Sequence, residues 1–173
     1  EKEALVSGAL DPDWTQPEFQ RGSYPLRTRL ARAIILGRLP HITLLPHPGY
    51  HAKGATTPAY LQTLSQYKVS ICTASVYGYA LRKIIESTAY GCVVITDLPE
   101  TDVLPGIDGN LHRIPSDTSA EDVNELARKL ADNYDPELQF AWAMRARERY
   151  QYQTLCSQLA QDIENMRSHY ADE

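Results

Sequence analysis

A glycine-containing turn followed by a predicted helix carries residues whose types and spacing suit the binding of a nucleotide. Gly78 lies directly before Tyr79 and Ala80, and a glycine lets a ligand approach the backbone closely. The first backbone N–H groups of a helix and their partial positive charge favour a phosphate at such a place. Glu86 lies seven residues after Tyr79, about 10 Å further along a helix. Its carboxylate leans back toward the helix start and can accept hydrogen bonds from both hydroxyls of a ribose.

Glu86 has a second interpretation as a solvated glutamate on a helix surface, and the sequence leaves both open. It follows two isoleucines and precedes the small residues Thr88 and Ala89, so it lies near the predicted buried face. Burying an unpaired carboxylate costs free energy. An inward position therefore favours a ligand-binding role.

Basic residues that can neutralise a diphosphate follow the first apolar segment. Gly8 lies near the end of this segment, and the next predicted helix contains Arg27 and Arg29. A guanidinium group suits phosphate oxygens. Residues two apart on a helix do not face the same way, and we favour Arg27. The alternative is that both are solvated surface arginines.

Tyr50 follows the second predicted strand and is a candidate for stacking on a base or a ribose. Packing within the protein explains a loop tyrosine equally well. His47 and His51 flank it, but the Pro48-Gly49 step between them denies the helical geometry of a paired metal site. We therefore expect no metal.

The elements that must position these residues alternate between strand and helix. Apolar and β-branched runs predict strands at 4–10, 42–45, 69–73 and 93–96, with a short fifth strand at 110–114. Helical spacing predicts helices that begin near Pro25, Thr57, Tyr79, Ser119 and Pro136, and a last amphipathic helix toward residue 170.

This alternation predicts an α/β fold: a Rossmann-like parallel sheet with helices on both faces, followed by C-terminal helices at about 137–170. The length fits one domain over residues 1–173. Parallel sheets bind ligands beyond the carboxyl ends of their strands. The loops after residues 10, 45, 73 and 96 are therefore expected to build the site.

Composition and charge argue against several classes of function. A formal charge of -5 argues against a nucleic-acid partner, and no apolar run is long enough to cross a membrane. The three cysteines are widely spaced, which predicts no disulfide framework and no zinc site. Such unpaired thiols favour a reducing, cytoplasmic setting.

Residues from Tyr67 to about Thr154 contain an ordered series of short motifs. These are ESTAYGCVVIT beginning at Glu86, DGNL beginning at Asp108 with IPSD beginning at Ile114, DPEL beginning at Asp135, and ARE beginning at Ala146. The series resembles the C-terminal, donor-binding domain of group 1 glycosyltransferases, the retaining GT-B fold enzymes. The resemblance implies one half of a GT-B fold, a nucleotide-sugar substrate such as a UDP- or GDP-sugar, no cofactor, and an acceptor-binding N-terminal domain in the parent protein.

The resemblance implies that Glu86 binds the ribose of the nucleotide sugar and that the backbone around Tyr79 and Ala80 holds the diphosphate. It also implies a first glycine loop, for which Gly8 is the candidate, followed by a basic residue that neutralises the diphosphate, for which we favour Arg27. The family commonly has a second glutamate eight positions earlier, where this sequence has Gly78. A branch similar to the spore-coat maturation glycosyltransferases instead has an arginine shortly before the glutamate, as Arg82 is here. We therefore expect the donor domain of a hexosyltransferase-like enzyme. This domain should bind the nucleotide sugar but should not complete the transfer reaction alone, and the sequence points to no catalytic residue.

Two other functions compete with this expectation. The first is a non-catalytic, GT-B-derived interaction module, which the glycine at position 78 favours. The second is an unrelated doubly wound domain such as a receiver-like module, which needs an acidic cluster after its first strand. Asp11 and Asp13 offer such a cluster, but no later lysine at the sheet edge completes it.

Overall fold

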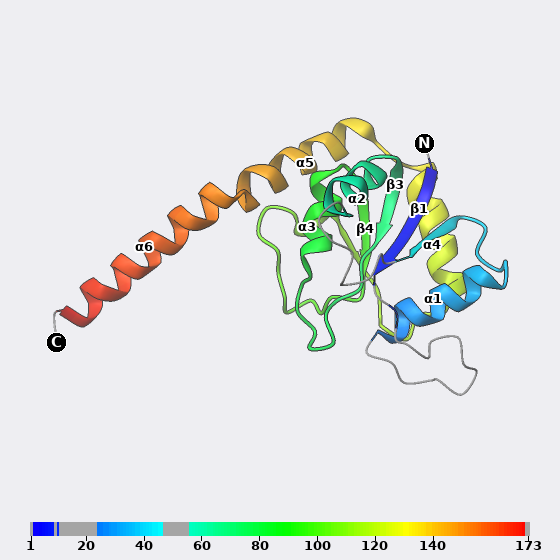
Figure 1. Cartoon of the computed structure of the whole chain (residues 1–173), viewed down its shortest axis with the longest axis horizontal. Helices are drawn as coiled ribbons and strands as arrows, with labels where there is room; N and C mark the ends of the chain where they lie inside the picture. Colours follow the sequence, from blue (N-terminus) through cyan, green and yellow to red (C-terminus); the bar gives the residue numbers. More distant parts are fainter. Residues whose placement is uncertain (1, 9, 11–23, 47–55, 172–173) are drawn as a thin grey trace.

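The computed structural model describes residues 2–8, 10, 24–46 and 56–171. Its core is a five-stranded sheet in the order β2-β1-β3-β4-β5, in which every neighbouring pair is parallel (Figure 1). The strands are β1 (Lys2–Gly8), β2 (Ile42–Pro46), β3 (Tyr67–Ile71), β4 (Val93–Thr96) and β5 (Leu111–Arg113). The expected α/β, Rossmann-like fold is confirmed.

The described residues form six α-helices. They are α1 (Pro25–Ile35), α2 (Thr56–Leu64), α3 (Arg82–Ala89), α4 (Ala120–Asp132), α5 (Pro136–Tyr150) and α6 (Tyr152–Ala171), and a short 3₁₀ helix at Asp108–Asn110 precedes β5. Of the six, α1 to α5 pack around the sheet.

Local sequence signals explain where several helices begin. Pro25 occupies the first turn of α1, where its missing N–H costs nothing. Ser119 caps α4 by accepting a hydrogen bond from the N–H of Asp122 at 3.1 Å. Asp135 caps α5 by accepting from the N–H groups of Glu137 and Leu138, at 2.9 and 3.1 Å.

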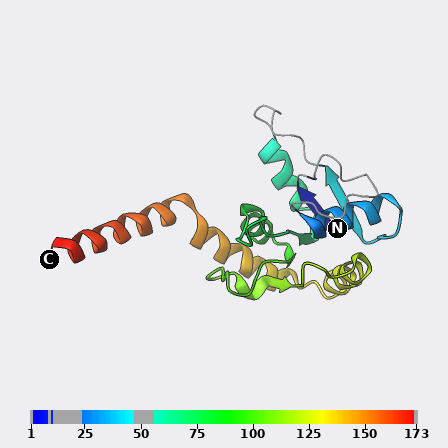
Figure 2. The ribbon, with the colours of Figure 1, turned by 90° about the horizontal axis from the view of Figure 1, so that it is seen from below.

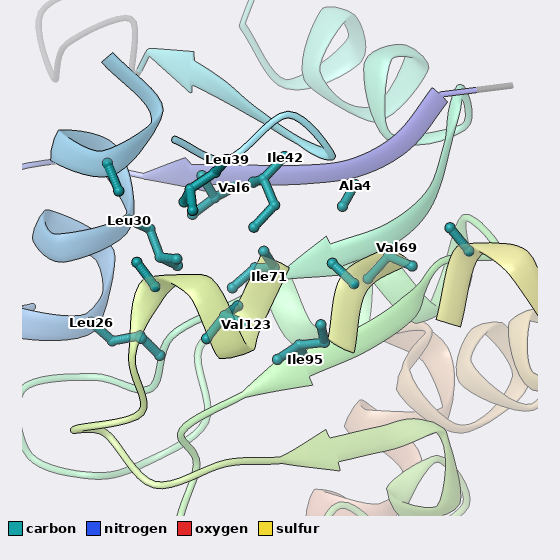
Figure 3. Packing of buried hydrophobic residues seen from close by; sticks show 14 of the residues in the cluster. Ala4, Val6, Leu26, Leu30, Leu39, Ile42, Val69, Ile71, Ile95 and Val123 are labelled. Carbon is teal, nitrogen blue, oxygen red and sulfur yellow. The ribbon is translucent and has the colours of Figure 1, made fainter. Parts of the chain in front are cut away.

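One face of the sheet packs against α1 and α4. Alternate residues of a strand point to the same face, and in β1 these are Ala4 and Val6 (Figure 3). Together with Val69, Ile71 and Ile95 of the neighbouring strands they meet the following buried side chains of the two helices: Leu26, Leu30, Ala33, Ala120, Val123, Ala127 and Ala131.

The other face packs against α2, α3 and α5. Ile84 of α3 and Ala146 of α5 are buried with Cys72 and Val94 of the sheet layer. Leu64 at the end of α2 is buried with Leu5, Tyr67 and Cys92. Helices thus cover both faces, as the sequence predicts.

The segment between β3 and α3 differs from the expected strand-to-helix turn. β3 ends at Ile71, and α3 begins at Arg82 with Leu81 as its N-cap, three residues later than the expected start at Tyr79. Ser75 to Tyr79 form a closed turn, in which Ser75 N–H donates to the Tyr79 carbonyl at 2.9 Å and Gly78 N–H donates to the Ser75 carbonyl at 3.0 Å. Gly78 has φ 77°, which glycine adopts without strain.

The last helix, α6, leads away from the sheet (Figures 1 and 2). Gln151 has extended backbone angles and separates it from α5. Within the part of the chain that the structure describes, neither α6 nor any other helix combines the length and the apolar character needed to cross a membrane.

Candidate functional site

The carboxyl ends of β1 and β3 form the centre of the candidate site. The chain passes from β1 to β2 on one side and then returns to β3 on the other side of β1. Open parallel sheets bind ligands beyond the carboxyl ends of the strands at such a reversal of direction. The side chains at this edge are therefore the first place to look for chemistry.

Arg27 reaches this edge from α1. Its side chain is buried, with 3% of the residue exposed, so the alternative of a solvated surface arginine is wrong. Its guanidinium group hydrogen-bonds Thr73 Oγ1 just after β3 and lies 4.1 Å from the centre of the Tyr24 ring. Arg29 points elsewhere and donates to the carbonyls of Ser116 and Thr118.

Gly8 at the end of β1 provides the space that Arg27 occupies. A Cβ atom at this position would lie 2.6 Å from both Cζ and Nη1 of Arg27. Gly8 also has φ 134°, a conformation that other residues rarely adopt. The sequence predicts Gly8 as part of the donor site, and in this structure its missing side chain makes room for the guanidinium group.

Lys83 brings a second cationic group to the same edge from α3. Its Nζ donates to Ser7 Oγ at 3.4 Å and lies 5.6 Å from the centre of the Tyr60 ring. Burial, followed by the positive charge of Arg27, lowers the pKa of Lys83 to about 8. Among the described residues no carboxylate lies within ion-pair distance of Lys83.

Tyr60 of α2 completes this group of side chains. Its hydroxyl is 3.2 Å from Ser7 Oγ. Burial, together with the nearby Cys72 and Glu86, raises the pKa of Tyr60 above its ordinary value, so the phenol stays neutral and keeps its O–H donor. Two cations and three hydroxyl groups thus meet at the carboxyl ends of β1 and β3: Arg27, Lys83, Ser7, Thr73 and Tyr60.

Glu86 lies three residues after Lys83 on α3, so the two side chains share a helix face. Its side chain is only 16% exposed, and its Oε1 forms an ion pair with Arg82 Nε at 2.8 Å. Arg82 is the ion-pair partner that the described residues provide for this carboxylate. Glu86 is therefore neither fully solvated nor unpaired.

Small polar side chains hold α3 close to the sheet. Ser87 Oγ donates to Ser70 Oγ of β3 at 2.9 Å and lies 3.3 Å from Cys72 Sγ. The Asn110 side-chain amide donates to Thr88 Oγ1 at 3.1 Å and to the Cys92 carbonyl at 2.9 Å. These contacts fix the position of α3, and with it the positions of Lys83 and Glu86.

The backbone at Tyr79 and Ala80 is already hydrogen-bonded. Tyr79 N–H donates to Ser75 Oγ at 3.2 Å, and Ala80 N–H donates to Asp102 Oδ2 at 2.6 Å. Because α3 begins only at Arg82, these two amides are not its first free N–H groups. A diphosphate held by them would have to displace the Ser75 and Asp102 side chains.

The remaining predicted residues lie elsewhere. Tyr50, His47 and His51 are outside the described residues. The Asp108-Gly109-Asn110 segment forms the 3₁₀ turn before β5, and Arg113 Nη2 donates to Asp108 Oδ1 at 2.5 Å. In this structure the motif is therefore a turn that leads into β5.

Sequence reasoning did not select Lys83, Tyr60, Ser7 or Thr73. The spacing of Lys83 could have pointed to it, because residues three apart on a helix share a face and Lys83 lies three residues before Glu86. For Tyr60 and Ser7 no such signal exists, since their proximity depends on the strand order. Within the described residues no three His, Cys, Asp or Glu side chains come together as a metal site.

Comparison with protein families, with curated protein sequences and with solved structures finds no match to this chain.

Proposed function

We propose that this chain is the donor-binding domain of a glycosyltransferase and that it binds a nucleoside-diphosphate sugar at the carboxyl ends of β1 and β3. The observation that carries the proposal is the meeting of Arg27 from α1 and Lys83 from α3 at this edge, with Glu86 one turn further along α3. Two cations and a carboxylate in this order match a diphosphate and the adjoining ribose.

The two cations supply the diphosphate part of the proposed site. Among the described residues Lys83 forms no ion pair, and a half-buried ammonium group without one is unfavourable until an anion joins it. A diphosphate beside Lys83 and Arg27 would offset the desolvation of the Lys83 ammonium group and the repulsion between the two cations. In a transfer reaction the same charges would stabilise the departing nucleoside diphosphate.

Glu86 supplies the ribose part. A carboxylate has several acceptor sites, so Glu86 can accept from a ribose hydroxyl while it stays paired with Arg82. This arrangement orients the carboxylate before the ligand arrives, which reduces the cost of binding. The phenol of Tyr60 lies close enough for the Glu86 charge to act on it, so we propose Tyr60 as a wall of the nucleoside site.

Isothermal titration calorimetry with UDP-, GDP- and ADP-sugars tests the proposal. We expect binding of at least one of them, and a loss of about 1.5–3 kcal/mol in Glu86→Ala because a charged hydrogen-bond acceptor is removed. The matched control is Glu148→Ala, which removes an exposed glutamate of α5 and should leave the affinity unchanged. Absence of heat with every nucleotide sugar would refute the proposal.

A second candidate function is a binding module without catalysis. Gly78, at the position where the resembled family commonly has a glutamate, favours it, and so do the engaged amides of Tyr79 and Ala80. Release of free nucleoside diphosphate from a bound donor separates the two functions. Binding without release, in the presence of the parent protein's remaining parts, would identify the module.

A further inference from the structure

Helix α6 presents an apolar stripe that nothing in the described structure covers. Tyr152 is 78% exposed and Leu159 is 60% exposed, and Leu155 and Ile163 are exposed as well. Cys156 is the exposed one of the three cysteines. Since the helix leads away from the sheet in both views (Figures 1 and 2), its own domain does not bury this stripe.

The stripe follows a seven-residue repeat over the whole helix. Tyr152, Cys156, Leu159 and Ile163 are spaced by four, three and four residues, and the sequence continues this spacing with Met166 and Tyr170. Such alternation is the spacing of positions d and a of a coiled coil. A helix that merely lies on its own domain needs a wider stripe with a period of 3.6 residues.

We propose that α6 is a dimerisation element, which forms a parallel two-stranded coiled coil with α6 of a second copy of this chain. Ile163 at an a position and Leu159 at a d position are the choices that favour two parallel strands. The helix of 20 residues spans about 30 Å, enough for nearly three heptads. The proposal is independent of the ligand that the sheet edge binds.

Charged residues beside the stripe favour the parallel orientation. In this register Asp162 occupies a g position and Arg167 the e position five residues later. In a parallel pair each Asp162 meets Arg167 of the second copy, so two ion pairs form across the seam, the line of a and d contacts between the two helices. Arg167 is now paired with Glu164 of its own helix at 3.0 Å, an exposed contact that leaves its other donors available.

In the half of α6 nearer α5, the positions beside the a and d residues are apolar. Leu155 at the preceding g position would meet Ala160 of the second copy, which extends the contact beyond the a and d residues. The exposure of Leu155 in the single chain has a simple explanation in such a dimer.

Analytical ultracentrifugation of the full chain measures the proposed association. We expect a monomer–dimer equilibrium that shifts to dimer as the concentration rises from low to high micromolar. Leu159→Asp should raise the dissociation constant by about a hundredfold or more, because dimerisation would bury unpaired charges. Ser157→Asp, on the outer face of the same helix, should change it little. A chain that stays monomeric throughout would overturn the proposal and assign the stripe to a different protein or domain.

A charge exchange tests the parallel orientation. Asp162→Arg and Arg167→Asp each place like charges across the seam, so each should weaken self-association by about tenfold. Mixed together, the two variants regain both attractive pairs and should form heterodimers in preference to either homodimer. Native mass spectrometry with one variant isotope-labelled reads this out, and a mixture with no preference for heterodimers contradicts the parallel register.

Cross-linking through Cys156 provides an independent measurement. Equivalent a positions face each other in a parallel pair, close enough for a disulfide. Diamide, which takes up the two electrons and two protons of the thiols, should convert the dimer to a covalent one. A Cys156→Ser, Ser157→Cys variant moves the thiol off the seam and should cross-link far more slowly. Equal rates for the two proteins would contradict the proposal.

Discussion

Lys83 is the residue of the candidate site whose charge changes within an accessible pH range. Burial and the charge of Arg27 lower its pKa to about 8. An anionic ligand prefers the protonated ammonium. If only this form binds, the affinity for a nucleotide sugar should fall by about tenfold between pH 7 and pH 9.

Calorimetry across this pH range checks the expectation, and Lys83→Arg is the matched variant. An arginine keeps its charge at both pH values, so the variant should bind with little dependence on pH. A wild-type affinity that is constant from pH 7 to pH 9 would show that Lys83 does not contact the ligand.

The same lysine is expected to reduce the stability of the free protein. Its pKa is lower in the folded state than the ordinary 10.5, so the cost of burying its charge is fully present below pH 8. This cost disappears as the pH rises toward the unfolded value. Lys83→Met should therefore raise the free energy of unfolding at pH 7, by about 1–2 kcal/mol after allowance for partial solvation.

Urea denaturation at pH 7 measures the effect of Lys83→Met. Lys129→Met removes an exposed ammonium group on α4 and serves as the control, with little change expected. A variant at position 83 that is less stable than wild type would mean that the ammonium group already has a favourable partner in the free protein.

Gly8 tests how closely the guanidinium group packs against β1. Gly8→Ala places a methyl group 2.6 Å from Arg27 Cζ on backbone with φ 134°, and both effects are unfavourable. We expect a loss of about 2–4 kcal/mol in the free energy of unfolding, measured by urea denaturation. In Gly37→Ala the glycine also has positive φ, but no atom lies within 4 Å, so about 1 kcal/mol is expected.

At the scale of secondary-structure elements, caps and short polar contacts fix the helices that carry the site. Asp135 begins α5 by accepting two backbone hydrogen bonds, and α5 packs on α3. The position of α3 is thus supported from the sheet side by Ser87 and from the outer side by α5.

Asp135→Ala should lower the free energy of unfolding by about 1 kcal/mol, because two N–H groups of the first turn lose their acceptor. Asp135→Asn keeps a side-chain oxygen there and should cost much less. Thermal unfolding followed by circular dichroism compares the two variants. Equal losses in both would mean that the carboxylate charge, rather than the hydrogen bonds, stabilises the helix start.

The boundaries of these elements show what a local pattern can predict. The β-branched run 93–96 predicts β4 correctly because a central parallel strand buries every residue. The caps at Ser119 and Asp135 likewise predict where α4 and α5 begin. The predicted start of α3 was wrong by three residues. The backbone N–H groups of Tyr79 and Ala80 donate to the side chains of Ser75 and Asp102 instead of beginning the helix, and no spacing rule predicts those contacts.

At the scale of the whole molecule, the order of the strands decides which residues meet. Alternation of strands and helices predicts a parallel sheet, and this much is confirmed, but it is compatible with more than one strand order. The order found here places α2 and α3 beside β1, so Tyr60 and Lys83 join Ser7. Those partners come from segments separated by more than 50 residues, which explains why the sequence alone does not point to Tyr60, Lys83 and Ser7 as one group.

The separation of α6 from the sheet gives a prediction for the entire chain. The large apolar side chains of α6 are exposed, so the helix adds little buried apolar surface to the domain, and burial of such surface is the main source of stability. A chain ending at Gln151 should therefore unfold within about 1 kcal/mol of the full chain when both are monomeric, and should bind a nucleotide sugar equally well.

Urea denaturation at low micromolar concentration and calorimetry check these two expectations on the shortened chain. At high concentration the full chain alone should gain stability with concentration, because dimerisation favours the folded state by mass action. The shortened chain lacks the proposed seam and should show no such dependence. A shortened chain that loses several kcal/mol at low concentration would instead show that α6 packs against its own domain, which would contradict the free helix on which the dimer rests.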